Sequence, residues 1–324
     1  MTQDILNISG DSPPLAIASS TPEGAMYFTV GDKPYVQLGG ISTTSATPIA
    51  SFLDNTRKCI KKAKYKRIQD LPTFGCRQNQ PIGLVGGGPS LKNPHILKEL
   101  KQFYSANMTV ACGSSHDWMV ENGMPPNICV VADPDPVSAN YLRRHSGYTK
   151  YFLASSSDQK VFDILKNESV YIWHNWSDEE DYIKNLSVID PNYTFCIGGG
   201  CTVGLRALCI ALFMGYSDIH FFGFDSCLGE DDVRYSYPLS TDGECMGHIY
   251  TIRMGMGTPH TKAYRCEGYH LAQAVHFKDF YETHNDKFTP VFHGDGLIKE
   301  LVDIVHREAI KIEKEELELK YERI

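Results

Sequence analysis

Three consecutive glycines, Gly86, Gly87 and Gly88, follow directly on a short apolar run, Ile82 to Val85. Glycines at the end of a strand let backbone N–H groups approach an anion closely, and a helix that begins there adds its N-terminal dipole. The hydroxyl of Ser90 can cap that helix or donate to a phosphate oxygen. The stretch matches neither G-x-G-x-x-G nor a loop ending in G-K-S/T, which excludes the ordinary dinucleotide and P-loop fingerprints. It predicts a phosphate-binding loop, with a tight strand-to-helix turn as the alternative.

Two carboxylates one residue apart, Asp133 and Asp135, follow the apolar run 128–132. Oxygen ligands with this spacing suit a magnesium ion that also holds a substrate phosphate. Asp133 is for this reason also a candidate catalytic residue. The alternative is that either carboxylate caps the helix that follows.

A second glycine run has the same arrangement of strand, glycines and helix. Gly198, Gly199 and Gly200 lie between an apolar run and a helix that begins near Thr202. A second anion site, or close contact with a base or ribose, explains this repetition. Asp225 ends another apolar run, in FFGFDS, and a polar tip on a buried strand is a candidate for ligand contact and catalysis.

The segment after Asp225 is long and rich in polar and aromatic residues. Its roughly forty residues are expected to be irregular and to form a lid or acceptor-binding loop over the site, because structureless segments of this length are usually functional or disordered. His248, His260 and His270 are candidates for a general base, with surface or structural histidines as the alternative. His248 is the one that we rank with the catalytic residues, and Arg234 is expected to face the phosphates.

The elements that position these residues follow from the hydrophobic pattern after Pro81. Apolar runs that do not alternate, separated by amphipathic stretches, predict a mainly parallel sheet covered on both faces. The fold class is therefore α/β, a Rossmann-like doubly wound domain whose ligand lies at the carboxyl ends of the strands. Strands are expected at 82–85, 108–112, 128–132, 151–154, 169–173, 194–197, 219–224 and 289–293, and helices near 94–105, 115–122, 136–145, 158–166, 202–214 and 269–283.

Three regions are expected along the chain. Residues 1–80 form an irregular N-terminal arm, rich in Ser, Thr, Pro and Gly, that ends in a basic helix. The basic face of that helix is either solvated or a patch for phosphate or an acidic neighbour. Residues 81–295 form the Rossmann-like nucleotide-binding domain, and residues 296–324 a C-terminal helix. The end of that helix is solvated or packs on a partner chain, which makes it the candidate contact in a homo-oligomer.

Composition excludes several classes of protein. The chain has 324 residues, 42% of them hydrophobic, and a formal net charge of -8, so nothing attracts it generally to nucleic acid or anionic membranes. It lacks the roughly 18 consecutive apolar residues of a membrane span and begins without a secretory signal, which predicts a cytoplasmic protein. Its ten cysteines form no C-x-x-C pair and are expected to be buried free thiols.

Three stretches together resemble the 6-hydroxymethylpterin pyrophosphokinase MptE-like domain family: GGGPSL at 86–91, VACGSSHDWMVENGMPPNICVVADPDP at 110–136 and GGGCTVGLRALCIALFMGYSDIHFFGFD at 198–225. This family includes the motility-associated-factor proteins implicated in flagellin glycosylation. GPSL and the strand that ends in G-x-D also look like bacterial sialyltransferases that use CMP-activated sugars.

For the pterin pyrophosphokinases the resemblance implies Mg²⁺-ATP and transfer of a diphosphate to a pterin hydroxymethyl group. The glycine loop then contacts phosphates, and Asp133 and Asp135 bind the metal. Those enzymes carry a His-Gly-Asp-Asn type segment after a middle strand, whereas this chain has His174 and Asn175 in IWHNWSDEED, with no Gly-Asp between them. The stretch GSSHDWMVENGMPPN is closer to the glycosylation-associated branch.

The sequence thus predicts a nucleotide-dependent group transferase. The donor is either ATP, which supplies a diphosphate, or a nucleotide-sugar such as a CMP-sugar, and the acceptor is a small molecule or a glycan. The alternative is a protein that binds a nucleotide or sugar-nucleotide without catalysis.

Overall fold

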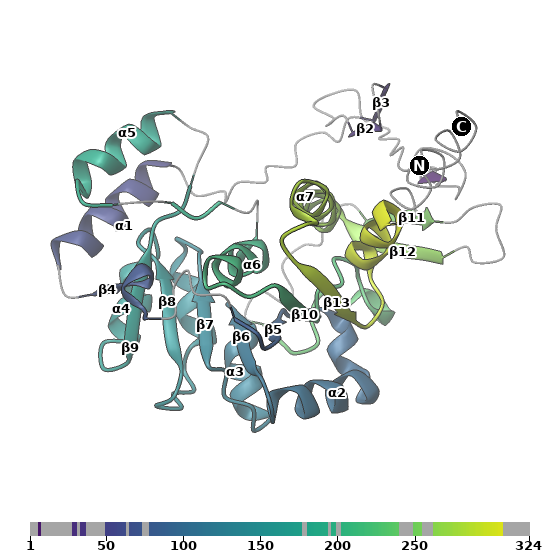
Figure 1. Ribbon diagram of the computed structural model, residues 1–324, viewed down its shortest axis with the longest axis horizontal. Coiled ribbons are helices and arrows are strands. Elements are labelled where there is room, and N and C mark those ends of the chain that lie inside the picture. The colour runs from purple at the N-terminus through teal and green to yellow at the C-terminus, as the bar shows by residue number, and fades with distance from the viewer. Residues whose placement is uncertain are drawn as a thin grey trace, which may run out of the picture.

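A computed structural model describes residues 49–62, 65–72, 78–176, 180–193, 196–198, 202–239, 249–254 and 262–306. It also assigns three short strands before residue 49: β1 (Leu6–Asn7), β2 (Phe28–Val30) and β3 (Lys33–Val36). The fold is a parallel sheet with helices on both faces (Figure 1). None of the helices in the described part of the chain has the length and hydropathy that a membrane span needs.

The main sheet has eight strands, all paired in parallel, in the order β13-β10-β5-β6-β7-β8-β9-β4. Seven predicted strands are present within one or two residues of their expected bounds, which confirms the α/β fold class. The strands are β4 (Lys66–Arg67), β5 (Ile82–Val85), β6 (Met108–Cys112), β7 (Ile128–Val131), β8 (Lys150–Ala154), β9 (Ser169–Trp173), β10 (Asp218–Phe222) and β13 (Thr289–His293).

Helices cover both faces of this sheet, with α6 and α7 above it and α2 and α3 below it in Figure 1. In β8, Phe152 and Ala154 belong to the core cluster on the α6 side, whereas Tyr151 and Leu153 belong to the opposite cluster. A strand buried on both sides is therefore apolar throughout. The α-helices are α1 (Ile49–Lys61), α2 (Pro94–Tyr104), α3 (Ser115–Glu121), α4 (Gln159–Ile164), α5 (Glu180–Ile189), α6 (Val203–Phe213) and α7 (Gly268–His284), and residues 297–306 are also helical.

The chain direction reverses at β5. From β5 the chain proceeds through β6, β7 and β8 to β9, and it then returns along α6 to place β10 on the other side of β5. In open α/β sheets, ligands bind in the crevice at the carboxyl ends of the strands where such a reversal occurs. The glycine loop 86–88 and Asp225 lie at this point, directly after β5 and β10.

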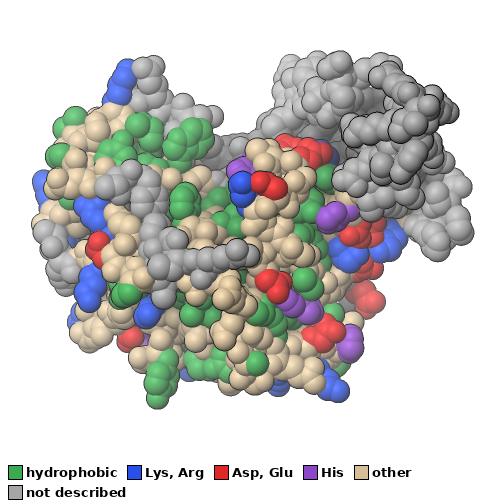
Figure 2. Space-filling model, viewed as in Figure 1, with side chains coloured by type: hydrophobic (Ala, Val, Ile, Leu, Met, Phe, Trp, Pro, Cys, Tyr) green, Lys and Arg blue, Asp and Glu red, His purple; other side chains and the backbone are tan. Residues whose placement is uncertain are grey.

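The sheet begins before residue 81, inside the region expected to be an arm. β4 pairs with β9 as the edge strand, and Ile68 is fully buried in the core. The basic helix is α1, which packs on α4 and α5. Lys58 of α1 and Lys62, the residue after this helix, pair with Asp54 and Asp163, which agrees with a solvated basic face. In Figure 2 several Lys and Arg side chains lie along the left of the molecule, where Figure 1 shows α1 and α4.

Three local expectations need correction. The helix expected at 136–145 is a 3₁₀ turn, η3 (Pro136–Tyr141). Of the strand expected at 194–197, the described residues show one isolated bridge, between Ile197 and Asn175. The segment after Asp225 is not irregular throughout, because β11 (Ile249–Met254) and β12 (Lys262–Glu267) pair as an antiparallel hairpin with Ile252 and Cys266 fully buried.

The remaining elements are short or incompletely described. Three further 3₁₀ turns are η1 (Ile68–Asp70), η2 (Pro89–Lys92) and η4 (Glu230–Asp232). Of the C-terminal helix expected over 296–324, residues 297–306 are helical and residues 307–324 lie outside the described part. The seven described cysteines are all free thiols.

Candidate functional site

The glycine loop is joined to the end of β10. The N–H of Gly86 donates to the carbonyl of Phe222 at 2.8 Å, and the N–H of Gly88 donates to the carbonyl of Gly223 at 2.9 Å. A Cβ atom at position 86 would lie 2.5 Å from the Gly223 oxygen, so a side chain there would separate the two loops. Two of the three glycine N–H groups are therefore used inside the protein, and the close packing of loop on loop explains two of the glycines.

Gly87 is covered by the segment that follows η4. A Cβ atom on it would lie 2.6 Å from the Tyr237 hydroxyl and 2.8 Å from the ring of Tyr235. The carbonyl of Gly87 accepts from the N–H of Ser236 at 3.0 Å. Residues 235–237 thus fold over the carboxyl edge of the sheet, as expected of the segment after Asp225. Among the described residues, none accepts a hydrogen bond from the N–H of Gly87, so this donor has no internal partner there.

Aromatic rings are grouped beside Gly87. Tyr237 stacks on Trp118 with ring centroids 5.9 Å apart, and its other neighbour is Tyr235 at 6.2 Å. Its hydroxyl forms a hydrogen bond with Ser114, which follows β6, at 3.0 Å. The covering segment is therefore fastened to the ends of both β5 and β6.

Asp225 is buried and connects three loops through hydrogen bonds and close packing. Its Oδ2 accepts from the N–H of Ser90 at 2.7 Å, and its carbonyl accepts from the N–H of Leu297 at 2.7 Å. Cβ atoms at Gly88 and Gly296 would lie within about 2.5 Å of Asp225, which explains why both are glycine. Asp225 is 4% exposed, and burial raises its pKa to about 6 against the hydrogen bonds from Ser90. This geometry makes Asp225 a positioning residue for the glycine loop.

Asp133 and Asp135 lie exposed after β7, at the same edge of the sheet. The Oδ1 of Asp133 accepts from the N–H of Asp135 at 2.9 Å, and the Oδ1 of Asp135 accepts from the N–H of Val137 at 2.8 Å and so caps η3. Although the residue is exposed as a whole, the atoms around its carboxyl group partly desolvate the carboxylate and raise the pKa of Asp133. Capping of the following turn is thus observed for Asp135, whereas Asp133 stabilises the loop that leads into it. Each carboxylate has a second oxygen, so the pair fits a metal that takes most of its ligands from water and phosphate, as Mg²⁺ does. The described residues include no group of three or more His, Cys, Asp or Glu arranged to hold a metal.

Asn55 of α1 holds the loop that carries these two carboxylates. Its Nδ2 donates to the carbonyl of Pro134 at 3.4 Å and to that of Ser156 at 3.1 Å. The side chain of Asn175 in turn donates to Ser156 Oγ at 2.8 Å. The ends of β7, β8 and β9 are therefore linked through amide side chains. Nothing in the sequence pattern singles out Asn55, because its burial to 8% exposure, which requires internal partners, is a property of the tertiary structure.

His174 forms a buried relay at the end of β9 and is 3% exposed. Its Nδ1 is 2.7 Å from Ser155 Oγ, and its Nε2 is 2.8 Å from Asp190 Oδ2. Asp190 also pairs with Arg67 of β4 at 2.7 Å. Burial lowers the pKa of His174, with the Asp190 carboxylate opposing the shift. Because both ring nitrogens are used internally, His174 joins β8, β9 and β4.

The second glycine run is described only at Gly198, since Gly199 and Gly200 lie outside the described residues. A Cβ atom at Gly198 would meet nothing within 4 Å. Thr202 caps α6, with its Oγ1 accepting from the N–H of Leu205 at 3.2 Å. The first turn of α6 packs against the loop after β10, because a Cβ atom at Gly204 would lie 2.8 Å from the ring of Phe224.

Two basic residues of the segment after Asp225, Arg234 and His270, are used or buried inside the protein. Arg234, expected to face phosphates, pairs with Glu267 through two bonds of 2.7 Å. His270 is 6% exposed, and burial lowers its pKa to about 4, so it is neutral at pH 7. His248 and His260 lie outside the described residues.

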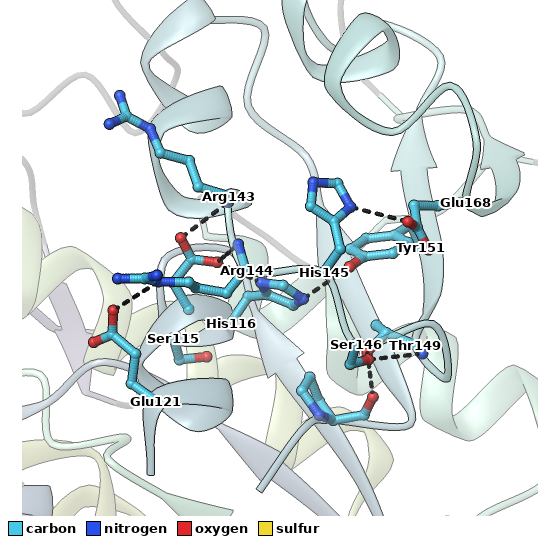
Figure 3. Close-up of polar contacts among 12 residues, drawn as sticks. Ser115, His116, Glu121, Arg143, Arg144, His145, Ser146, Thr149, Tyr151 and Glu168 are labelled. Atoms are coloured by element: carbon cyan, nitrogen blue, oxygen red, sulfur yellow. Dashed lines mark hydrogen bonds and ion pairs between the residues drawn. The ribbon is translucent and has the colours of Figure 1, made fainter. Parts of the chain in front are cut away.

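The stretch 115–121, which carries part of the family resemblance, has structural contacts (Figure 3). His116 is fully buried and its Nε2 lies 3.0 Å from the hydroxyl of Tyr151. Asp117 accepts from the N–H groups of Arg143 and Arg144 at 2.9 and 3.1 Å. These residues hold the connection between η3 and β8, whereas Ser115 Oγ donates to the carbonyl of Val85 at 2.6 Å and so ties β6 to β5.

Trp176 is half exposed, at 50%, just beyond β9, on a backbone that is held firmly. Its N–H donates to the carbonyl of Ile197 at 2.9 Å, and its own carbonyl accepts from Arg206 of α6 at 3.4 Å. Arg206 also donates to the Ile197 carbonyl. A large aromatic side chain is thus presented to solvent at the carboxyl edge.

Comparison with known proteins agrees with this architecture. No curated protein sequence matches the chain. A solved structure of a MAf glycosyltransferase from Magnetospirillum magneticum AMB-1 has a similar fold, with a TM-score of 0.57 and 14% sequence identity. The likeness covers 78% of this chain and 38% of that one, so this chain spans well under half of that protein. Residues 50–231, more than half of the chain, match the family described as 6-hydroxymethylpterin diphosphokinase MptE-like. The chain therefore belongs to the 6-hydroxymethylpterin diphosphokinase MptE-like family, as the three resembling stretches predict.

Proposed function

We propose that the protein is a glycosyltransferase that uses a nucleotide-activated sugar. The observation that carries this proposal is the convergence, at the carboxyl ends of β5, β6 and β10, of one unpartnered glycine N–H, the first turn of α6 and the aromatic residues of 235–237. A backbone donor and a helix N-terminus suit the phosphate of a nucleotide, and aromatic rings suit a base or sugar. The similarity in fold to a glycosyltransferase supports this choice.

In this proposal the donor lies across the reversal point of the sheet. The N–H of Gly87 and the N-terminus of α6, capped by Thr202, contact the phosphate, and Ser90 and Asp225 keep the glycine loop in place. Gly198, Gly199 and Gly200 precede α6 and stay candidates for contact with the base or ribose. In the transfer the acceptor oxygen forms a bond to the anomeric carbon, the bond from that carbon to the phosphate oxygen breaks, and a base takes the acceptor's proton. His248 stays our candidate for that base.

Trp176 is the proposed contact for the acceptor. It lies four strands from the glycine loop, which is about 19 Å at the usual spacing between strands. That span accommodates a nucleotide-sugar together with the acceptor end. An exposed aromatic ring on a fixed backbone offers a flat apolar face against which a sugar ring can stack.

Diphosphate transfer from ATP is the second candidate, and the carboxylates after β7 favour it. Asp133 and Asp135 would hold Mg²⁺, which neutralises charge on the phosphates in such a reaction. Against it, His174 and Asn175, which replace the His-Gly-Asp-Asn type segment, are both buried and bonded internally.

The experiment is a donor screen followed by product analysis. A thermal-shift screen compares CMP-, UDP- and GDP-sugars and ATP, each with Mg²⁺ and with EDTA. The ligand that stabilises the protein most is then incubated with the protein and a set of glycans and pterins. Mass spectrometry then reports a gain of one sugar or of one diphosphate on the acceptor. A sugar gain, absent in Trp176→Ala, is the expected result. A diphosphate gain supports the second candidate, and tight binding with no turnover on any acceptor supports a binding protein without catalysis.

A further inference from the structure

A cavity of about 700 Å³ lies at the opposite edge of the sheet from the proposed active site. It is formed by the C-terminal ends of α6 and α7 and by the turns that lead into β10 and β13. Because each of these strands has five residues, the cavity is about 16 Å from the glycine loop. Its volume is within the range of small-molecule sites.

Several aromatic rings line the cavity. Phe213, at the end of α6, is 44% exposed, which is unusual for so large an apolar side chain. Across the cavity, the ring of Phe280 stacks on His284 with centroids 4.3 Å apart and contacts Phe288 at 6.2 Å. An apolar or aromatic body would cover these rings and remove Phe213 from water.

Among the polar groups that line the cavity, His284 offers a hydrogen-bond acceptor. His284 Nδ1 lies 2.9 Å from the carbonyl of Phe280 and must donate to it, so in the neutral ring Nε2 is an acceptor. The C-terminal ends of α6 and α7 both carry the negative pole of a helix dipole. One carboxylate and one ammonium, Asp286 and Lys287, pair with each other at 2.6 Å and add no net charge.

We propose that this cavity binds a small aromatic amine in its protonated form. The ring lies between Phe213 and Phe280, and the ammonium donates to His284 Nε2 at the C-terminal end of α7. Aromatic faces and helix C-termini both favour a cation over a neutral or anionic group. The site is separate from the proposed transfer reaction and does not depend on it.

The test uses three probes with the same phenylethyl body: 2-phenylethylamine, 2-phenylethanol and 3-phenylpropanoate. Calorimetry on the full chain should show that the amine binds at least about fivefold more tightly than the alcohol, and that the carboxylate binds weakest. The amide NMR signals of Gly215, Ser217 and Asn285, which line the cavity, should shift on titration with the amine.

Two variants locate the binding. Phe213→Ala changes an exposed position, so the protein should fold and lose amine affinity about tenfold. Tyr148→Ala, at a residue that is 85% exposed and does not line the cavity, is the matched control and should bind normally. Equal affinity for amine and alcohol, absence of amine binding up to about 10 mM, or equal loss in both variants would overturn the proposal.

Discussion

Asp225 accepts a hydrogen bond at 2.7 Å from the backbone N–H of Ser90, which lies 135 positions earlier in the chain. This contact joins the loop after β10 to the 3₁₀ turn after β5, the two strands between which the direction of the chain reverses. It makes Asp225 one of the residues that hold the glycine loop in position, together with the bonds from Gly86 and Gly88 to the end of β10.

The stability contributed at Asp225 should depend on pH. Burial raises its pKa from 3.8 to about 6, so between these values the folded state binds more protons than the unfolded chain. The free energy of unfolding should therefore fall as the pH rises through this window and become level above it. Asp225→Asn cannot titrate, yet its amide oxygen can still accept from Ser90. Urea unfolding of both proteins from pH 4 to pH 7 measures the difference, and a difference that does not change with pH would contradict this reading.

Gly87→Val should weaken binding of the donor nucleotide tenfold or more, which is about 1.4 kcal/mol. The valine side chain would enter the space beside the one unpartnered N–H of the loop. Its Cβ atom alone would lie 2.6 Å from the Tyr237 hydroxyl. Calorimetry on the folded variant gives the affinity.

The double variant Gly87→Val with Tyr237→Ala separates two causes of that loss. If the loop contacts the ligand directly, the double variant binds as weakly as Gly87→Val. Restored affinity would show instead that the substitution acts by displacing residues 235–237.

Under the second candidate function, diphosphate transfer with Mg²⁺ held by Asp133 and Asp135, Asn55→Leu should raise the Mg²⁺ concentration needed for half-maximal activity. The leucine has a similar volume but cannot donate to the carbonyls of Pro134 and Ser156, so the loop that carries Asp133 and Asp135 loses its support. Lys58→Met, on the exposed face of the same helix, is the matched control. A lower melting temperature with an unchanged Mg²⁺ requirement would mean that Asn55 has only a structural role. Activity of the wild type that is the same in Mg²⁺ and in EDTA would contradict a magnesium site at Asp133 and Asp135.

Arg234→Met should destabilise the protein by about 3–5 kcal/mol, because it leaves the buried Glu267, which is 3% exposed, without its charged partner. The double variant Arg234→Met with Glu267→Gln should recover much of this loss, as measured by urea unfolding. Since the pair is structural, nucleotide affinity in the double variant should stay close to that of the wild type. A large loss of nucleotide affinity in the double variant would instead support the expectation that Arg234 contacts the phosphates.

Local patterns in the sequence predicted most of the sheet. Runs such as Ile82 to Val85 and Ser169 to Trp173 are strands because parallel strands buried on both faces must be apolar throughout, and this property is visible without tertiary information. The glycines and the strand-end aspartates were found by the same reasoning, since the carboxyl edge of such a sheet is where polar and small residues interrupt apolar runs.

Other features were decided by contacts between distant parts of the chain. β4 has two residues and becomes a strand only because β9 offers it a free edge. The sequence shows that Gly86, Gly87 and Gly88 have no side chains, but not that Gly223, Tyr237 and Asp225 take up the space. In the same way, Arg234 and His174 look available for chemistry until their partners Glu267 and Asp190 are placed beside them. Burial and pairing depend on residues tens to hundreds of positions away, so only the tertiary structure determines which polar side chains face the crevice and which hold it together.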